Sequence, residues 1–186
     1  MFIDYVPVML ANMTAGLLIL AMYLLFGKSR SWAAGFAMAG LVAFLAGLHM
    51  IFTWPLPGAY NIAFGGPSVL FGTLFLGAAL AIARNWPLTP VGIYAMIAGA
   101  VAVLVGVRVI DLHLTASPVV SGVGFMLTGA GSILAGLGIV VPRGRPIRCL
   151  AAAALIVAAA IWAFTCGMGY WAHLASFAKY APPASP

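Results

Sequence analysis

Three histidines are the residues of this chain with the clearest capacity for chemistry. His49, His113 and His173 recur about every sixty residues, each near the end of a long apolar run. An imidazole at membrane depth is costly to leave without a partner, and imidazoles bind haem iron, copper and zinc readily. The spacing therefore predicts three histidines near one face of a membrane, where two or all three could hold a common ligand.

Small and aromatic neighbours single out two of these histidines. Gly169 lies one helical turn before His173 and leaves a flat slot beside it, with Tyr170 next in sequence, while Trp54 follows shortly after His49. Two histidines on different membrane helices with such neighbours suit a six-coordinate haem b, whose properties depend on its axial ligands and burial. The sequence has no Cys-x-x-Cys-His motif, so such a haem would be held without covalent links. This interpretation predicts His49 and His173 as axial ligands, with Gly169, Trp54 and Tyr170 around the ring.

One arginine lies near the end of an apolar run and has an acid close by. Arg108 and Asp111 are three residues apart, a spacing that places both on one side of a helix. An arginine at this depth needs a counter-charge. We therefore expect Arg108 to pair with Asp111 or with a haem propionate.

Two other interpretations use the same residues. Three converging imidazoles, with His113 included, would suit copper or zinc, and Met50 or Met168 could add a soft ligand for cuprous copper. Alternatively, each histidine bonds only to water or to a backbone carbonyl, and the protein is a non-catalytic small subunit or scaffold of a larger membrane complex. Small residues along the apolar runs would then form docking surfaces.

The composition places all of these residues in a membrane protein. Of 186 residues, 65% are hydrophobic and 5% are charged, whereas a soluble domain carries about 25% charged residues. A helix needs about 20 apolar residues to cross a bilayer. The runs predict an all-α bundle of six transmembrane helices, at about 5–27, 32–53, 66–84, 88–112, 117–141 and 147–174. Residues 1–180 are expected to form one transmembrane domain, and 181–186 a flexible tail.

The basic residues predict the orientation of the bundle. Most of them fall in connections on one side: Lys28, Arg30, Arg84, Arg143, Arg145 and Arg148. Only Arg108 and Lys179 belong to the other side. Positive residues favour the cytoplasmic side, so both termini and the histidines are expected outside the cytoplasm, in a cell inner or plasma membrane. The net charge of +6 serves topology and does not indicate a nucleic acid partner.

Two further patterns bear on the architecture. The stretch from His49 to Gly72 has no charge and is rich in proline, glycine and aromatic residues, which predicts a folded lid over the bundle end. Pro7, Pro67 and Pro118 lie near the starts of the first, third and fifth helices, where proline is well tolerated. With the histidines closing the even-numbered helices, the bundle could be three helical hairpins in tandem.

Four stretches resemble an uncharacterised family of bacterial and archaeal integral membrane proteins, domain of unknown function 981. They are FIDYVPVMLANM, HMIFTWPLPGAYNIAFG, LTASPVVSGVGFMLTG and YWAHLASFAKY, and the resemblance covers nearly the whole chain. It brings no activity with it. It does imply that His49 and His173 belong to motifs that define the family, which favours a two-histidine site.

These observations predict a small membrane haem b protein that transfers electrons at the outer, periplasmic face. It would act by itself or as a subunit of an oxidoreductase complex. Besides the lipid bilayer, its expected partner is a quinol or a periplasmic electron carrier. The sequence shows no nucleophile–base pair, phosphate-binding loop or carboxylate dyad, so it does not support a hydrolase or an ATPase.

Overall fold

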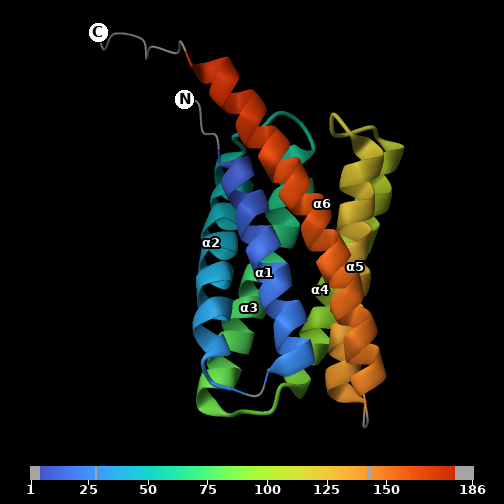
Figure 1. The fold of residues 1–186 in the computed structure, drawn as a ribbon. Helices are drawn as coiled ribbons and strands as arrows, with labels where there is room; N and C mark the ends of the chain where they lie inside the picture. Colours follow the sequence, from blue (N-terminus) through green and yellow to red (C-terminus); the bar gives the residue numbers. More distant parts are fainter. Residues whose placement is uncertain (1–4, 28, 142–143, 179–186) are drawn as a thin grey trace, which may run out of the picture.

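The protein is an all-α bundle in the computed structural model, which describes residues 5–27, 29–141 and 144–178. Its long helices are α1 (Val6–Phe26), α2 (Trp32–Thr53), α3 (Gly66–Arg84), α4 (Thr89–Asp111), α5 (Pro118–Val140) and α6 (Arg145–Phe177) (Figure 1). A π-helical turn, η1 (Asn61–Gly65), leads into α3. The six predicted helices are confirmed to within a few residues. The predicted tail, 181–186, lies outside the described residues.

Each long helix is long and apolar enough to cross a membrane. This follows from the sequence, because the hydrocarbon core offers no partner for backbone groups except those within a helix. The 33 residues of α6 correspond to about 50 Å at 1.5 Å per residue, more than the roughly 30 Å thickness of the hydrocarbon core. Figure 1 shows α6 crossing the others at a tilt and running past the start of α1.

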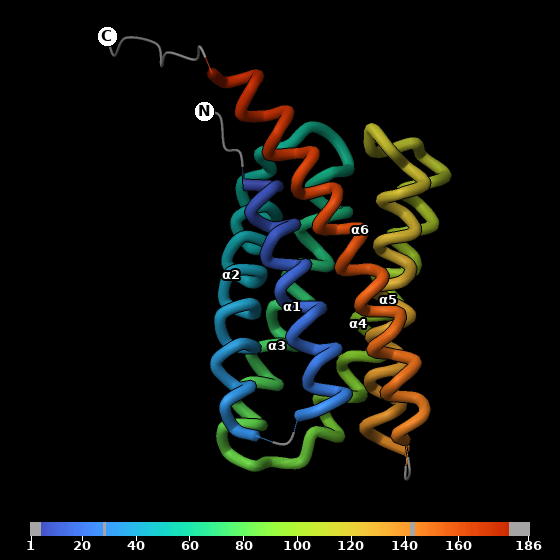
Figure 2. The backbone as a smooth tube through the Cα atoms, in the orientation of Figure 1, coloured from blue at the N-terminus to red at the C-terminus, as the bar shows by residue number. Residues whose placement is uncertain are grey.

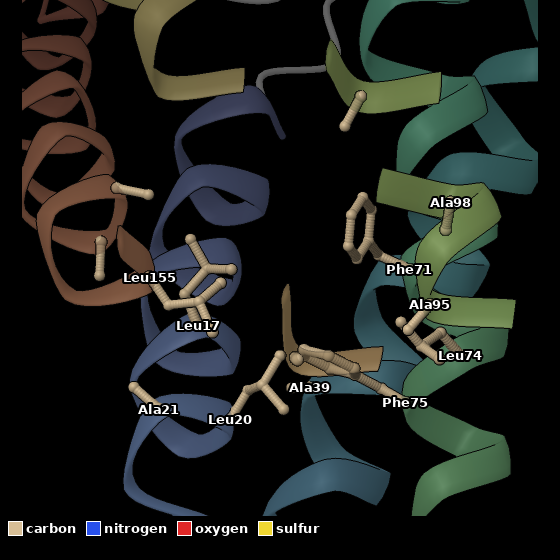
Figure 3. Close-up of a cluster of buried hydrophobic side chains, with 14 of the residues drawn as sticks. Leu17, Leu20, Ala21, Ala39, Phe71, Leu74, Phe75, Ala95, Ala98 and Leu155 are labelled. Carbon is tan, nitrogen blue, oxygen red and sulfur yellow. The ribbon is translucent and has the colours of Figure 1, made fainter. Parts of the chain in front are cut away.

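The helices form a closed ring in chain order. Each packs on the next along the chain, and α6 packs back on α1 (Figure 2). The centre of the ring is filled by buried apolar side chains, among them Leu17, Phe71, Phe75 and Leu155. Figure 3 shows these side chains meeting from α1, α3 and α6. The ring order puts α1 between α2 and α6, and it puts α4 on the opposite side from α1.

Glycines decide which neighbours approach most closely. They recur every seventh residue on facing sides of two helix pairs: Gly92, Gly99 and Gly106 on α4 opposite Gly122, Gly129 and Gly136 on α5, and Gly40 and Gly47 on α2 opposite Gly65 and Gly72 at α3. A Cβ added at Gly99 would lie 2.5 Å from the Gly129 carbonyl oxygen, and one at Gly72 would lie 2.5 Å from the Phe44 amide nitrogen. Only glycine permits such backbone contact, as is usual between membrane helices.

The predicted pairing of helices differs from the observed one. The sequence suggested hairpins α1–α2, α3–α4 and α5–α6. In the structure α2 packs closely on α3, and α4 on α5, while α1 has more extensive contact with α6 than with α2. Proline also begins α4 and α6 as well as the odd-numbered helices, so its positions mark helix starts in general and carry no threefold repeat.

The two ends of the bundle have different chemistry. The ends of α1, α3 and α5 and the starts of α2, α4 and α6 lie together at one end (Figure 1), which we call the basic end. Its described cations are Arg30, Arg84, Arg145 and Arg148. The opposite end, where α2, α4 and α6 finish, we call the histidine end.

Candidate functional site at the histidine end

Two helices that carry candidate ligands, α2 and α6, contact the start of α1. The ring of His49, on α2, meets the ring of Tyr5 edge-on, with 5.6 Å between centroids. On the other side, the thiol of Cys166 on α6 donates to the Pro7 carbonyl at 3.3 Å. A Cβ added at Gly169 would lie 3.6 Å from Pro7 Cγ. Thus α2 and α6 approach the same turn of α1 from two sides.

His173 follows Gly169 by four residues on α6. One helical turn corresponds to about 5 Å along the axis, so His173 lies one turn further out than the contact between Gly169 and Pro7. Its side chain is half-buried, whereas His49 is exposed. Both histidines therefore belong to the histidine end, on the two helices that flank α1. Tyr170 is also on this part of α6 and is exposed.

A hydrogen-bonded threonine lies beside the ring of His49. The Thr53 hydroxyl donates to the backbone carbonyl of His49 at 2.7 Å. The same oxygen lies 3.4 Å from His49 Nδ1. A ring hydrogen on Nδ1 could donate to this oxygen, and the lone pair of the imidazole would then be on Nε2. Metal-binding histidines are held in this way, with the second nitrogen donating to a nearby oxygen.

Tyr5 is the residue of this site that sequence reasoning missed. Its hydroxyl is buried and has no hydrogen-bond partner among the described residues. Burial raises the pKa of Tyr5 above its ordinary value, so at neutral pH the hydroxyl is a neutral donor beside His49. A buried polar group without a partner costs free energy. The only signal in the sequence was its position in the stretch FIDYVPVMLANM.

The loop after α2 folds back over the bundle through one buried asparagine. Asn61 accepts a hydrogen bond from the Leu56 amide at 3.0 Å and donates to the carbonyls of Leu56 and Gly58. Trp54, which ends α2 in a left-handed conformation, points outward and is half exposed. The fully buried Asn61 therefore organises this loop, and Trp54 does not enclose a site within it.

Two predicted site residues lie elsewhere. Arg108 is exposed and pairs with Asp111, which is one of the two partners expected from the sequence. It belongs to α4, which packs chiefly on α5 and α3, across the ring from α1. His113 is exposed just after the end of the same helix. Among the described residues, no three of the histidines, cysteines, aspartates and glutamates come together as metal ligands.

The fold and the ends of the bundle define a polytopic α-helical membrane protein whose titratable groups sit at its two surfaces. The chain belongs to the family of proteins of unknown function DUF981, whose sequence profile matches residues 1–176. No curated protein and no solved structure matches the chain. The match agrees with the resemblance found in the four sequence stretches.

Proposed function

We propose that the histidine end holds a haem b between His49 and His173, and that the protein passes electrons at this surface. The observation that carries the proposal is the Thr53 hydroxyl beside His49 Nδ1, because a ring hydrogen donated to it would leave Nε2 as the ligand atom. When bound, the haem would supply one-electron chemistry. The chain's own residues would bind and orient the group and keep its environment partly apolar.

Each residue around the first turn of α1 has a role in this proposal. Gly169 keeps one face of α6 flat beside His173. Tyr5 offers its unpartnered hydroxyl to an anionic group such as a propionate, a role that the sequence had given to Arg108. Because α1 lies between α2 and α6, the ligand would stand at the end of the bundle, above Tyr5, and not within the ring.

The interior of the ring supports this surface position. A cavity of about 20 Å³ lies between α1, α2 and α3, and another of about 30 Å³ lies nearer the basic end. Each has room for a water molecule. Neither cavity is lined by a histidine.

The orientation and partners complete the proposal. The basic end would face the cytoplasm, so that both termini and the histidine end lie on the periplasmic or outer side. A quinol within the bilayer or a periplasmic electron carrier could then reach the site directly. The protein would act by itself or as one subunit of an oxidoreductase complex.

Absorbance of the purified protein is the test. We expect a low-spin haem b spectrum that His49→Ala or His173→Ala abolishes or sharply alters. His113→Ala is the matched control, since it removes an exposed histidine from the same end, and it should leave the spectrum nearly intact. A haem spectrum that survives both of the first two changes would contradict the ligand assignment.

Other results would favour the other interpretations. A colourless protein with stoichiometric copper or zinc, lost only when His113 is also replaced, would indicate the three-histidine site. A colourless, metal-free protein that copurifies with other subunits would indicate a scaffold in a larger membrane complex.

A further inference from the structure

Arg148 is a half-buried cation in the first turn of α6, at the basic end. Its Nε atom is buried and has no hydrogen-bond partner among the described residues. The stem of the side chain lies against α5, where a Cβ added at Gly138 would come within 2.6 Å of Arg148 Cγ. On α1, the Tyr23 hydroxyl is within electrostatic range of the guanidinium. The stem of Arg148 thus packs against α5, and Tyr23 of α1 is near enough for the charge to act on its hydroxyl.

No described residue supplies a counter-charge for Arg148. The two acids of the sequence are Asp4 and Asp111. Asp111 pairs with Arg108 at the histidine end, and Asp4 lies outside the described residues. The other described charges at the basic end are all positive: Arg30, Arg84 and Arg145. The described part of the chain therefore leaves Arg148 without an acidic partner.

We propose that Arg148, together with the Tyr23 hydroxyl, binds a phosphate-type oxyanion at the basic end of the bundle. A guanidinium presents its donors in a planar fork that matches two phosphate oxygens, and hydrogen bonds between charged groups are stronger than neutral ones. The hydroxyl of Tyr23 supplies a further donor. This site is separate from the histidine end and does not depend on a haem there.

The oxyanion has two possible sources. The basic end lies where the helices leave the membrane, so the phosphate of an anionic lipid headgroup is available at this level. Basic residues near a membrane surface attract such lipids by about 1 kcal/mol each. Free inorganic phosphate offers the same oxygens, and the two sources are separated by the choice of probe.

The test compares thermal unfolding of wild-type protein and variants in a neutral maltoside detergent. The probes are phosphatidylglycerol, phosphatidylcholine and inorganic phosphate, each added separately. In Arg148→Gln the guanidinium is lost, and in Tyr23→Phe only the hydroxyl. Arg145→Gln is the matched control, because it removes an exposed arginine from the same turn of α6. Retention of phosphatidylglycerol, measured by native mass spectrometry, gives a second readout.

We expect Arg148→Gln to weaken retention of the bound phosphate group by about tenfold or more, as for loss of a hydrogen bond to a charged group. Tyr23→Phe should weaken it less, and Arg145→Gln should stay within about twofold because exposed charges contribute little. Adding the anion should also reverse which of the two proteins, wild type or Arg148→Gln, is the more stable. Without added anion, Arg148→Gln should unfold no earlier than wild type, since an unpaired half-buried charge is removed. With the anion, wild type should be the more stable.

The probe that stabilises the protein identifies the source of the oxyanion. Stabilisation by phosphatidylglycerol alone identifies a lipid headgroup, and stabilisation by inorganic phosphate identifies a free anion. Equal losses in Arg145→Gln and Arg148→Gln would show general surface attraction and overturn the site. A variant Arg148→Gln that is less stable than wild type without any anion would show that Arg148 has a partner within the chain, which would also overturn it.

Discussion

At the scale of single residues, each end of the bundle has a buried donor atom that the described residues leave without a partner. These atoms are the Tyr5 hydroxyl at the histidine end and Arg148 Nε at the basic end, whereas His49 has its Nδ1 beside Thr53. Buried donors are almost always paired in folded proteins. These two exceptions therefore mark positions where a group from outside the chain would complete the structure.

Thr53 gives a residue-scale prediction about His49. Thr53→Val removes the oxygen beside Nδ1, so no contact there would favour the hydrogen on that ring nitrogen. We expect haem retention to fall by about tenfold, as for loss of other outer ligand contacts, with a shift of the midpoint potential. Both are measured by spectrally monitored titration.

Thr73→Val is the control for this change. Thr73 is also exposed and donates to a carbonyl four residues earlier, at 2.8 Å, but no histidine adjoins it in that contact. It should leave haem retention unchanged. If the two valine variants behaved alike, Thr53 would have no positioning role.

At the scale of helices, close packing depends on glycines that face one another. The pairs α2–α3 and α4–α5 bring backbone against backbone, which suits a membrane because apolar burial gives little drive for association within lipid. The loop after α2 depends instead on the three hydrogen bonds of Asn61. Helix pairs and loop are thus held by different forces.

The glycine seam between α4 and α5 predicts a large effect from one methyl group. Gly99→Ala would place a Cβ 2.5 Å from the Gly129 carbonyl oxygen, and the helices would have to separate. We expect a loss of about 1–3 kcal/mol in the free energy of unfolding, as for other overpacked sites. Gly77→Ala on α3 meets nothing within 4 Å, so it should be neutral or stabilising through helix propensity. Thermal unfolding in detergent distinguishes the two.

Asn61 predicts how the loop responds to protease. In wild type the stretch between Trp54 and Tyr60 should resist cleavage, because its turn is held by a buried side chain. Asn61→Ala removes all three hydrogen bonds and should expose the stretch to rapid cleavage. Asn61→Asp keeps the acceptor for the Leu56 amide but loses both donations, so an intermediate rate is expected. Rapid cleavage of the wild type would show that the loop is not a folded lid.

At the scale of the whole molecule, six helices form a closed ring with a basic end and a histidine end. The described arginines other than Arg108 lie at the basic end, and the positive-inside rule places such an excess of basic residues on the cytoplasmic side. By this rule we expect the basic end in the cytoplasm, and the two proposed sites would then face different compartments.

Cysteine labelling tests this orientation. In a background of Cys149→Ser and Cys166→Ala, Ser31→Cys reports the basic end and Ser117→Cys reports the histidine end; both serines are exposed. In intact cells an impermeant maleimide should label position 117 and reach position 31 only after lysis. The reverse pattern would place the histidine end in the cytoplasm and would exclude a periplasmic electron carrier.

Some features of the candidate site could be predicted from the sequence, and others could not. Sequence reasoning predicted the pairing of Arg108 with Asp111, which the structure shows, since this pairing depends on residue type and local spacing. The choice of His49 and His173 as ligands stays a prediction.

Sequence reasoning missed the buried hydroxyl of Tyr5, the hydrogen bonds of Asn61 within the loop after α2, and the partial burial of Arg148. Tyr5 and Arg148 have their surroundings from helices distant in the sequence, which no single stretch records. Asn61 bonds to Leu56 and Gly58 a few residues earlier, but residue type alone does not specify these bonds.

The sequence alone determined the six helices, because a bilayer forces every apolar run of sufficient length to satisfy its own backbone hydrogen bonds. It also determined the separation of charge between the two ends, since basic residues stand in alternate connections. Only the tertiary structure decided which helices are close partners and that α1 stands between α2 and α6. Those outcomes depend on which glycines face each other across different helices, and that is a property of pairs of surfaces and not of any one stretch of sequence.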